Sequence, residues 1–260
     1  MVTTEYPAGS PNWVDLGSPD TGAAAAFYGA VFGWEFRSAG PEAGGYGFFQ
    51  QGGKTVAAVG PLNEPGAASA WTVYFSTPDA DALAKAVEQG GGAVRMAPMD
   101  VMDAGRMALF TDPTGGRFAI WQPGRTKGLD AIGEPNTFCW AELHTADPAA
   151  AISFYQALYG WGAADSGLPG IEYSVLSVAD AGPQDMGFGG VAGPHEGLAD
   201  GWLLHFAVPD ADAAVAATSA QGGSVVMPAS DLPTVGRIAV LADPAGAQFA
   251  VIQPVPPQSA

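Results

Sequence analysis

The amino-acid sequence predicts an α+β fold in which four strand–helix–three-strand (βαβββ) units form two tandem domains. Two long-range repeats support this prediction: Trp13–Asp20 (WVDLGSPD) recurs as Trp140–Asp147 (WAELHTAD), and Trp71–Asp79 (WTVYFSTPD) recurs as Trp202–Asp210 (WLLHFAVPD). An Asp-Pro-x-Gly sequence also occurs once in each half. Repeats of this length indicate duplicated supersecondary units, and 260 residues suit two domains of about 130 residues each.

The first unit is recognised from its cap and turn residues. Asp20 is placed to cap a helix over Ala23–Phe32, because an Asp side chain accepts N–H groups of the first helical turn, and Gly33 ends this helix. Gly52-Gly53 separates two β-rich runs and predicts a hairpin. The strands expected in this unit are Trp13–Ser18, a short strand around Phe36, Tyr46–Gln51 and Thr55–Val59.

The second unit follows a linker rich in Pro, Gly and Ala and repeats the pattern. Asp79 caps a predicted helix over Ala80–Gln89, and the turn Asp112–Gly116 links the last two strands. Its expected strands are Trp71–Ser76, Ala93–Met96, Arg106–Thr111 and Arg117–Gln122. The second half repeats both units, which predicts domains at residues 8–125 and 133–256.

The chain is strongly acidic, with 26 Asp and Glu residues against 9 Lys and Arg and a net charge of −17. Such a surface repels phosphate groups, so we expect neither nucleic acids nor membranes as partners. We expect a small-molecule ligand. The acidity either serves solubility alone or favours a cationic compound. The chain is expected to be a monomer or a homodimer.

The single cysteine, Cys139, excludes an intrachain disulfide framework and is predicted to be a buried structural thiol in an apolar strand. No segment approaches the roughly 18 uninterrupted apolar residues of a membrane span, and no signal peptide is recognised. These features predict a cytoplasmic protein.

The repeated marks resemble those of the vicinal oxygen chelate superfamily, the glyoxalase, bleomycin-resistance and dioxygenase fold. They are the Asp before the Phe-Tyr pair of a helix, the Gly-Trp at the end of that helix, and Asp-Pro-x-Gly before the last strand of each half. The whole chain is similar to two-domain glyoxalase-like proteins of actinobacteria, which are often named as glyoxalases or hydroxylases. The resemblance implies paired units whose sheets form an open barrel, with a ligand and often one divalent metal on its concave face.

In metal-using relatives, the first ligand lies seven residues before the Asp that ends a strand, and a Glu ligand follows Asp-Pro-x-Gly. The matching positions here carry no such ligand: they are Trp13, Thr72, Ala119, Trp140, Leu203 and Ala250. The remaining ligand strand, 54–60 or 187–193, contains no Asp, Glu or His. We therefore expect no metal at the family positions and no other cofactor.

A second polar set forms the candidate active site. Because strand side chains alternate between faces, Trp140, Glu142 and His144 share one face, and His205 is predicted to lie on that face too. Glu142, His144 and His205 are candidate catalytic residues, since His titrates near neutral pH and a Glu in an apolar cavity can have a raised pKa. The same three residues offer an alternative metal site. A third reading makes them ligand-contacting or structural residues without catalysis.

The ligand-binding candidates around this set are mainly aromatic, because aromatic walls suit a flat or apolar compound. They are Trp13, Asp15, Tyr74, Trp121 and Trp140. The first half has Gly17 where the second has His144, so we expect the activity to lie in the second half.

Two arginines recur after a glycine in corresponding hairpins. Arg106 and Arg237 are each preceded by an acidic residue, Asp103 and Asp231. We interpret them as structural arginines that tie these turns, with anion binding as the alternative.

The sequence thus favours a glyoxalase-like small-molecule enzyme of metabolism or detoxification, a lyase or isomerase with an atypical or absent metal site. The alternative is a non-catalytic protein of the bleomycin-resistance type that binds or sequesters an aromatic, cationic compound. A hydroxylase or dioxygenase role has less support, because no residue set in the sequence serves it.

Overall fold

The computed structural model describes residues 4–62, 64, 66–168, 170, 172–179 and 187–255. Its first half contains the two predicted units, here called modules 1 and 2. Module 1 consists of β1 (Pro11–Ser18), α1 (Thr21–Phe32), β2 (Glu35–Ser38), the short 3-10 turn η1 (Pro41–Ala43), β3 (Gly47–Gln51) and β4 (Lys54–Pro61). Module 2 consists of β5 (Ala70–Ser76), α2 (Ala80–Gln89), β6 (Ala93–Val101), β7 (Gly105–Thr111) and β8 (Arg117–Pro123).

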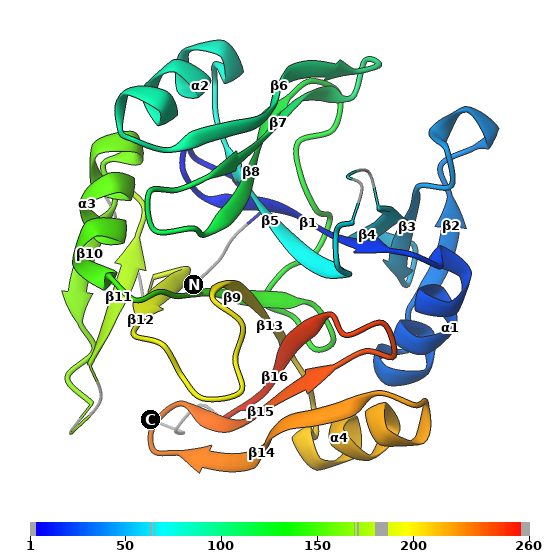
Figure 1. Ribbon diagram of the computed structural model, residues 1–260. Coiled ribbons are helices and arrows are strands. Elements are labelled where there is room, and N and C mark those ends of the chain that lie inside the picture. The colour runs from blue at the N-terminus through cyan, green and yellow to red at the C-terminus, as the bar shows by residue number, and fades with distance from the viewer. Residues whose placement is uncertain are drawn as a thin grey trace. The chain divides into compact units, whose positions relative to one another are not determined.

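The second half repeats the same order, as predicted (Figure 1). Module 3 consists of β9 (Phe138–His144), α3 (Pro148–Tyr159), β10 (Gly162–Asp165), β11 (Tyr173–Ser177) and β12 (Gly189–Ala192). Module 4 consists of β13 (Gly201–Ala207), α4 (Ala211–Ala220), β14 (Ser224–Leu232), β15 (Gly236–Ala242) and β16 (Gln248–Pro254).

The strands form two mixed sheets of eight, in the orders β2-β3-β4-β1-β5-β8-β7-β6 and β10-β11-β12-β9-β13-β16-β15-β14. Each sheet begins and ends on a different strand and is therefore open. In each module the first strand pairs with the last in parallel, and the hairpin strands pair antiparallel. The α+β prediction is confirmed. Among the described residues, no helix is long and apolar enough to span a bilayer.

An aspartate caps each of the four helices. Asp20, Asp79, Asp147 and Asp210 each accept the backbone N–H of the residue three positions on, at 2.9 Å. This satisfies one of the N–H groups that a helix start leaves unpaired. The predicted caps at Asp20 and Asp79 are confirmed, and so is the end of the first helix at Gly33, which has φ 73°.

Strand β6 differs from its prediction, because it continues from Ala93 to Val101 rather than ending near Met96. Pro98 within this run argued against a strand, since proline cannot donate to a sheet ladder. β6, however, is the last strand of its sheet, and its pairing with β7 shifts register on both sides of Met96. An edge position with bulges tolerates proline, so the strand continues through it.

The described residues also divide into two compact units, each of which draws on both halves of the sequence. Unit 1 comprises the N-terminal residues up to Val14, with Thr72–Leu129 and Trp140–Leu203. Unit 2 comprises Asp15–Trp71, Asp130–Cys139 and the residues from Leu204 on. Unit 1 thus joins most of modules 2 and 3, and unit 2 joins most of modules 1 and 4. The domain limits at 8–125 and 133–256 stay a prediction, and residue 256 lies outside the described part.

In unit 1, a buried Trp–Tyr–Asp chain joins module 3 to module 2. Tyr155 Oη on α3 donates to Asp112 Oδ2 at 2.9 Å and accepts from Trp202 Nε1 at 3.1 Å. Asp112 Oδ1 accepts the backbone N–H groups of Thr114 and Gly116 in the Asp-Pro-x-Gly turn. Burial, reinforced by the Asp112 charge, raises the pKa of Tyr155 well above its ordinary value, so its hydroxyl remains a donor.

Unit 2 contains the same arrangement. Tyr28 Oη on α1 donates to Asp243 Oδ2 at 3.2 Å and accepts from Trp71 Nε1 at 3.0 Å. The Trp of each Gly-Trp mark stacks on the helix tyrosine of its own unit: Trp34 lies 6.0 Å from Tyr28, and Trp161 lies 4.8 Å from Tyr155 between ring centroids. The marks that repeat along the sequence are therefore the parts that join modules from opposite halves.

Replacement of Asp112 by alanine should lower the free energy of unfolding by about 2–4 kcal/mol, because Tyr155 and two turn N–H groups lose a buried acceptor. Urea denaturation measures this change. Asp112→Asn keeps one acceptor oxygen and should recover much of the loss. If Asp112→Ala were as stable as the parent protein, the Trp–Tyr–Asp hydrogen bonds would not be what holds modules 2 and 3 together.

Candidate functional site

Glu142 and His144 lie together on β9 in unit 1. They are two residues apart on a strand and so point to the same side, and the Glu142 Oε1 and His144 Nε2 atoms are 2.7 Å apart. β9 pairs in parallel with β12, which places Gly190 beside Glu142 and Ala192 beside His144. The side chain of His144 is 5% exposed and that of Glu142 is 17% exposed. The sequence prediction that these two residues converge is confirmed.

The surroundings of His144 favour its charged form. Burial lowers the pKa of this imidazole, but the Glu142 carboxylate, the Gly193 carbonyl and the charge of Asp200 outweigh burial, so its pKa is raised. Nδ1 lies 3.3 Å from the Gly193 carbonyl oxygen, which can only accept a hydrogen bond. Both ring nitrogens therefore face acceptors, an arrangement that suits a doubly protonated imidazolium.

Tyr173 on β11 completes this cluster and was not among the residues predicted from sequence. Its hydroxyl accepts from Trp140 Nε1 at 2.7 Å and is hydrogen-bonded to Glu142. Burial, together with the Glu142 charge, raises the pKa of Tyr173. A Cβ on Gly190 would lie 2.2 Å from the Tyr173 ring, so glycine is needed there to admit the tyrosine. The sequence repeat could have identified Tyr173, because Tyr46 and Tyr173 are related by the same shift in residue number as Trp13 and Trp140.

The corresponding cluster of the first half lies in unit 2 and is smaller. Tyr46 Oη donates to Asp15 Oδ2 at 3.1 Å, which repeats the tyrosine–carboxylate contact. No imidazole is present, because Gly17 occupies the position of His144. A Cβ on Gly17 would lie 3.3 Å from Leu62, whose side chain takes up this space. The acid–base pair is therefore a property of the second half.

His205 and Tyr74 occupy equivalent positions in different units. His205 on β13 pairs in register with Ala250 in unit 2, and Tyr74 on β5 pairs with Ala119 in unit 1. Both side chains are buried. The role of His205 as a third catalytic residue stays a prediction. Cys139 donates to the His205 carbonyl oxygen, and burial raises the pKa of its thiol to about 12, which fits the predicted structural role.

The tryptophans predicted to contact a ligand are largely enclosed. In unit 1, Trp13 and Trp121 stack at 6.4 Å between ring centroids, with 22° between their planes. Trp121 Nε1 donates to the Thr126 carbonyl oxygen at 2.8 Å. Both side chains are buried, so this pair is an aromatic contact inside the unit, fixed at one edge by a hydrogen bond. Whether it contacts a ligand stays a prediction.

The family metal does not fit the residues at its ligand positions. Trp, Thr, Ala and Leu side chains offer no carboxylate, imidazole or thiolate to a divalent cation. On the neighbouring strands, Ala119 and Ala250 pair with Tyr74 and His205. Within the described residues, no group of three or more His, Cys, Asp and Glu side chains is placed to hold a metal ion.

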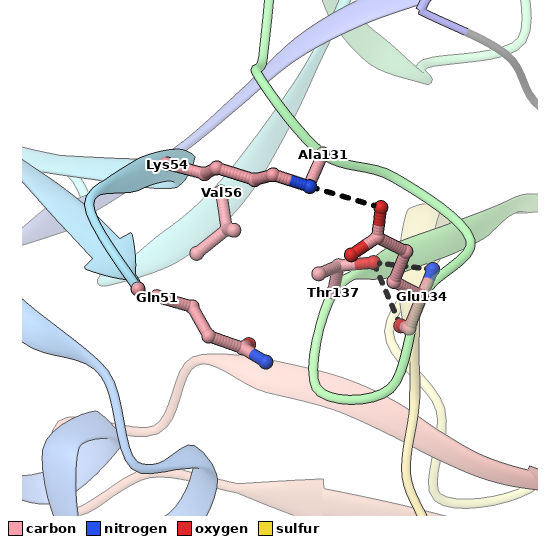
Figure 2. Close-up of a pocket in the computed structure, with 7 residues that line it drawn as sticks. Gln51, Lys54, Val56, Ala131, Glu134 and Thr137 are labelled. Carbon is pink, nitrogen blue, oxygen red and sulfur yellow. Dashed lines mark hydrogen bonds and ion pairs between the residues drawn. The ribbon is translucent and has the colours of Figure 1, made fainter.

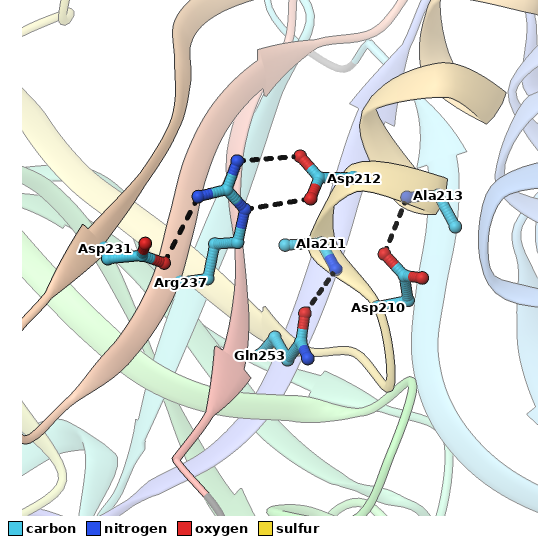
Figure 3. A network of polar contacts seen from close by, with 7 residues as sticks. All are labelled: Asp210, Ala211, Asp212, Ala213, Asp231, Arg237 and Gln253. Carbon is cyan, nitrogen blue, oxygen red and sulfur yellow. Dashed lines mark hydrogen bonds and ion pairs between the residues drawn. The ribbon is translucent and has the colours of Figure 1, made fainter.

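The recurrent arginines pair with carboxylates of their own modules. Figure 3 shows Arg237 with Asp212 and Asp231. Arg237 contacts Asp212 at 2.9 Å and Asp231 at 3.2 Å. Arg106 contacts Asp81 and Asp100 in the same manner, whereas Asp103, the partner suggested by the sequence, pairs with Arg125. Asp103 lies in the hairpin turn between β6 and β7, where Arg125, just after β8, contacts it. Both recurrent arginines therefore have the structural role that we predicted.

The fold and this cluster define a protein of the glyoxalase type, and comparison with known families agrees. Residues 10–120 match the Glyoxalase/Bleomycin resistance protein/Dioxygenase superfamily, and residues 140–252 match a Glyoxalase-like domain. The chain belongs to this superfamily.

Among individual proteins, it is 44% identical to the anthracycline biosynthesis protein DnrV of Streptomyces peucetius, across 96% of this chain and 95% of that protein. It is 41% identical to CFP32 of Mycobacterium tuberculosis (strain CDC 1551 / Oshkosh), provisionally named a glyoxylase, across 98% of both.

Solved structures agree on the fold. A 2,2',3-trihydroxybiphenyl 1,2-dioxygenase from Sphingomonas wittichii strain RW1 superposes with a TM-score of 0.65 and 17% identity, over 95% of this chain and 91% of that one. The Mn(II)-bound glyoxalase from Novosphingobium aromaticivorans gives a TM-score of 0.64 and 16% identity, over 94% and 82%. Likeness at this level of identity establishes the architecture and leaves the chemistry to the site.

The Glu142–His144 pair should make stability depend on pH. Because the folded pKa of His144 is raised, its contribution is fully present below the unfolded pKa of about 6.5 and is lost as pH rises through the folded pKa. Urea denaturation at pH 6 and pH 9 measures the difference. Glu142→Gln removes the carboxylate and leaves burial, which lowers the His144 pKa, so this part of the pH dependence should shrink. An unchanged profile in Glu142→Gln would contradict the pairing.

Proposed function

We propose that this protein is a small-molecule enzyme of the glyoxalase-like type that works by acid–base catalysis in its second half, without the metal of the family. The observation that carries the proposal is the enclosed contact of 2.7 Å between Glu142 and His144, with Tyr173 hydrogen-bonded to the same carboxylate. Perturbed titratable groups gathered in a partly enclosed site are typical of active sites. The family ligand positions carry no metal-binding side chains, which leaves this pair as the reactive set.

The two groups suit proton transfer next to a carbonyl group. Glu142 would take a proton from the carbon beside the carbonyl, and the C–H electron pair would form a carbon–carbon double bond. His144 would give its Nε2 proton to the carbonyl oxygen, so that an enol forms without a free charge. Glu142 would then give its proton to a different carbon of a conjugated enol, while the enol O–H proton returns to His144 and the carbonyl group re-forms, which completes an isomerisation. Tyr173 would hold the Glu142 carboxylate in place and is a positioning residue.

The expected substrate class is a flat carbonyl compound, of which aromatic polyketides are one kind. The stacked pair Trp13–Trp121 and the enclosed Trp140 supply apolar aromatic surface in the same unit. DnrV is named for anthracycline biosynthesis, which supports a polycyclic aromatic ligand for this chain as well. The net charge of −17 favours neutral or cationic compounds over anionic ones.

A second candidate is a non-catalytic protein that binds or sequesters an aromatic compound. The same tryptophan surfaces favour it, because stacking needs no acid–base pair. The two candidates differ in one measurable respect. With a binder, an aromatic compound would quench the tryptophan fluorescence and be released unchanged, whereas an enzyme would convert it.

Turnover of aromatic and dicarbonyl substrates, followed by liquid chromatography and mass spectrometry, should depend on the second-half pair. Glu142→Gln and His144→Gln should each lower kcat by about 10²–10⁴-fold, the usual contribution of acid–base catalysis. Tyr173→Phe should have a smaller effect, because it only positions Glu142. Glu88→Gln, the same chemical change at an exposed position on α2, should leave kcat within about twofold. His205→Gln tests the third predicted residue. Full activity in Glu142→Gln would exclude the proposed mechanism.

Removal of divalent metals should not reduce this activity. The expected rate after dialysis against EDTA equals that before it, because the family positions offer no metal ligands. Addition of Mn²⁺, Ni²⁺, Zn²⁺ or Fe²⁺ should leave the rate unchanged. Loss of activity on chelation, with recovery on addition of one metal, would contradict the metal-free mechanism.

A further inference from the structure

A small cavity lies in unit 2, apart from the Glu142–His144 pair of unit 1. It has a volume of about 210 Å³ and is lined by Gln51, Gly52, Lys54, Val56, Ala131, Glu134 and Thr137 (Figure 2). One wall is the β3–β4 hairpin, and the other is the segment before β9. Neither the repeated marks nor the proposed function uses these residues.

The walls of this cavity are fixed by hydrogen bonds. Asp130 and Thr55 exchange two hydrogen bonds at 2.8 Å, one through the Asp130 side chain, which joins the hairpin to the segment. The Thr137 hydroxyl donates to the Glu134 carbonyl oxygen and accepts the Glu134 N–H. Trp34 Nε1 donates to the Asn136 carbonyl oxygen at 2.8 Å. A cavity held in this way exists before a ligand arrives, which reduces the entropy lost on binding.

One buried acceptor at the cavity lacks a donor. Gln51 Nε2 donates to the Pro135 carbonyl oxygen at 3.2 Å, and this bond fixes which end of the amide is which. Gln51 Oε1 is buried and accepts no hydrogen bond from any described protein group. A buried acceptor of this kind is uncommon in folded proteins and calls for a partner. The terminal torsion of Gln is broad, so a small rotation turns Oε1 toward a donor in the cavity.

The cavity also carries one group of each charge. Lys54 Nζ lies 3.3 Å from Glu134 Oε1 across the two walls, and both side chains remain about half exposed. Figure 2 shows this ion pair on one side of the cavity and the Gln51 amide on the other. Lys54 keeps further N–H donors, and the Glu134 carboxylate keeps further acceptor sites. The floor is apolar, from Val56 and Ala131.

These polar groups occur in only one of the two copies of the repeat. At the shift of the first repeat, Gln51 corresponds to Val178, Glu134 to Pro7 and Thr137 to Ser10. The turn itself is retained, because the Ser10 hydroxyl donates to the Pro7 carbonyl oxygen as Thr137 donates to that of Glu134. The turn therefore forms in the other copy without the amide and the charge, which are particular to this cavity.

We propose that this cavity binds a small zwitterion with a primary ammonium group and a carboxylate, such as an α-amino acid. The ammonium group donates to Gln51 Oε1 and to the Glu134 carboxylate, and the ligand carboxylate accepts from Lys54. The zwitterion inserts between Lys54 and Glu134, so that its carboxylate faces the Lys54 ammonium group and its ammonium group faces the Glu134 carboxylate. A volume of about 210 Å³ is below that of pockets for drug-sized ligands and limits the ligand to a few heavy atoms.

The test is titration of the full chain with L-alanine, acetate and ethylamine, followed by amide NMR shifts at Gly52, Gly53 and Lys54. We expect L-alanine to bind with a Kd on the order of 1 mM, the range for so small a ligand, and the two half-ligands to bind at least about tenfold more weakly. Glu134→Gln and Gln51→Leu should each weaken alanine binding about tenfold. The exposed Glu88→Gln, the same chemical change outside the cavity, should have no effect.

Several outcomes would overturn the proposal. Acetate or ethylamine binding as tightly as L-alanine would replace it with a simple anion or cation site. No alanine-induced shift at these amides, or unchanged binding in a folded Glu134→Gln variant, would exclude the zwitterion site. Thermal unfolding of each variant verifies that it folds. If Gln51→Leu does not fold, Lys54→Met takes its place in the test. Catalysis by Glu142 and His144 is measured separately, so neither result decides the other.

Discussion

The buried hydrogen bond between a helix tyrosine and the aspartate of an Asp-Pro-x-Gly turn is the interaction on which the rest of the fold depends. In unit 1 it runs from Tyr155 to Asp112, and in unit 2 from Tyr28 to Asp243. A buried carboxylate is costly unless all its acceptor sites are used. Here the turn N–H groups and the tyrosine hydroxyl donate to these sites together. The turn, the helix and the contact between modules are therefore expected to form cooperatively.

This dependence explains which positions the duplicated halves keep and which they change. The tyrosine, the aspartate and the tryptophans at the helix ends are shared, because each contacts a module from the other half. Side chains on the opposite face of the first strand bear no such constraint. Asp15 and Gly17 therefore stand where Glu142 and His144 stand in the second half. The two halves therefore share the same backbone arrangement, but the second half has the His144 imidazole where the first half has the Leu62 side chain.

The sequence predicted the elements well, because caps, turns and strand alternation are local and recur four times. It also predicted that Glu142 and His144 converge, since both lie on one strand at the required spacing. It missed Tyr173, which reaches Glu142 from another strand across Gly190, and it missed the module partners, since Tyr155 and Asp112 are far apart in the chain. Contacts of this kind depend on the order of strands in the sheet and on glycines that leave space for a large side chain. Neither can be recognised from one segment of the sequence.

The acid–base pair also shows how this fold can hold a reactive polar site where the family's ligand positions are apolar. A divalent cation requires several anionic or imidazole ligands at fixed positions, and Trp140 occupies one of them. Glu142 lies one strand period further on and His144 two. A lone charge at this depth would be neutralised by burial, but a carboxylate beside an imidazolium has no net charge and tolerates enclosure. The raised pKa of His144 follows from this balance. The proposed acid–base mechanism requires such a pair, because it keeps a proton between a carboxylate and an imidazole inside the protein.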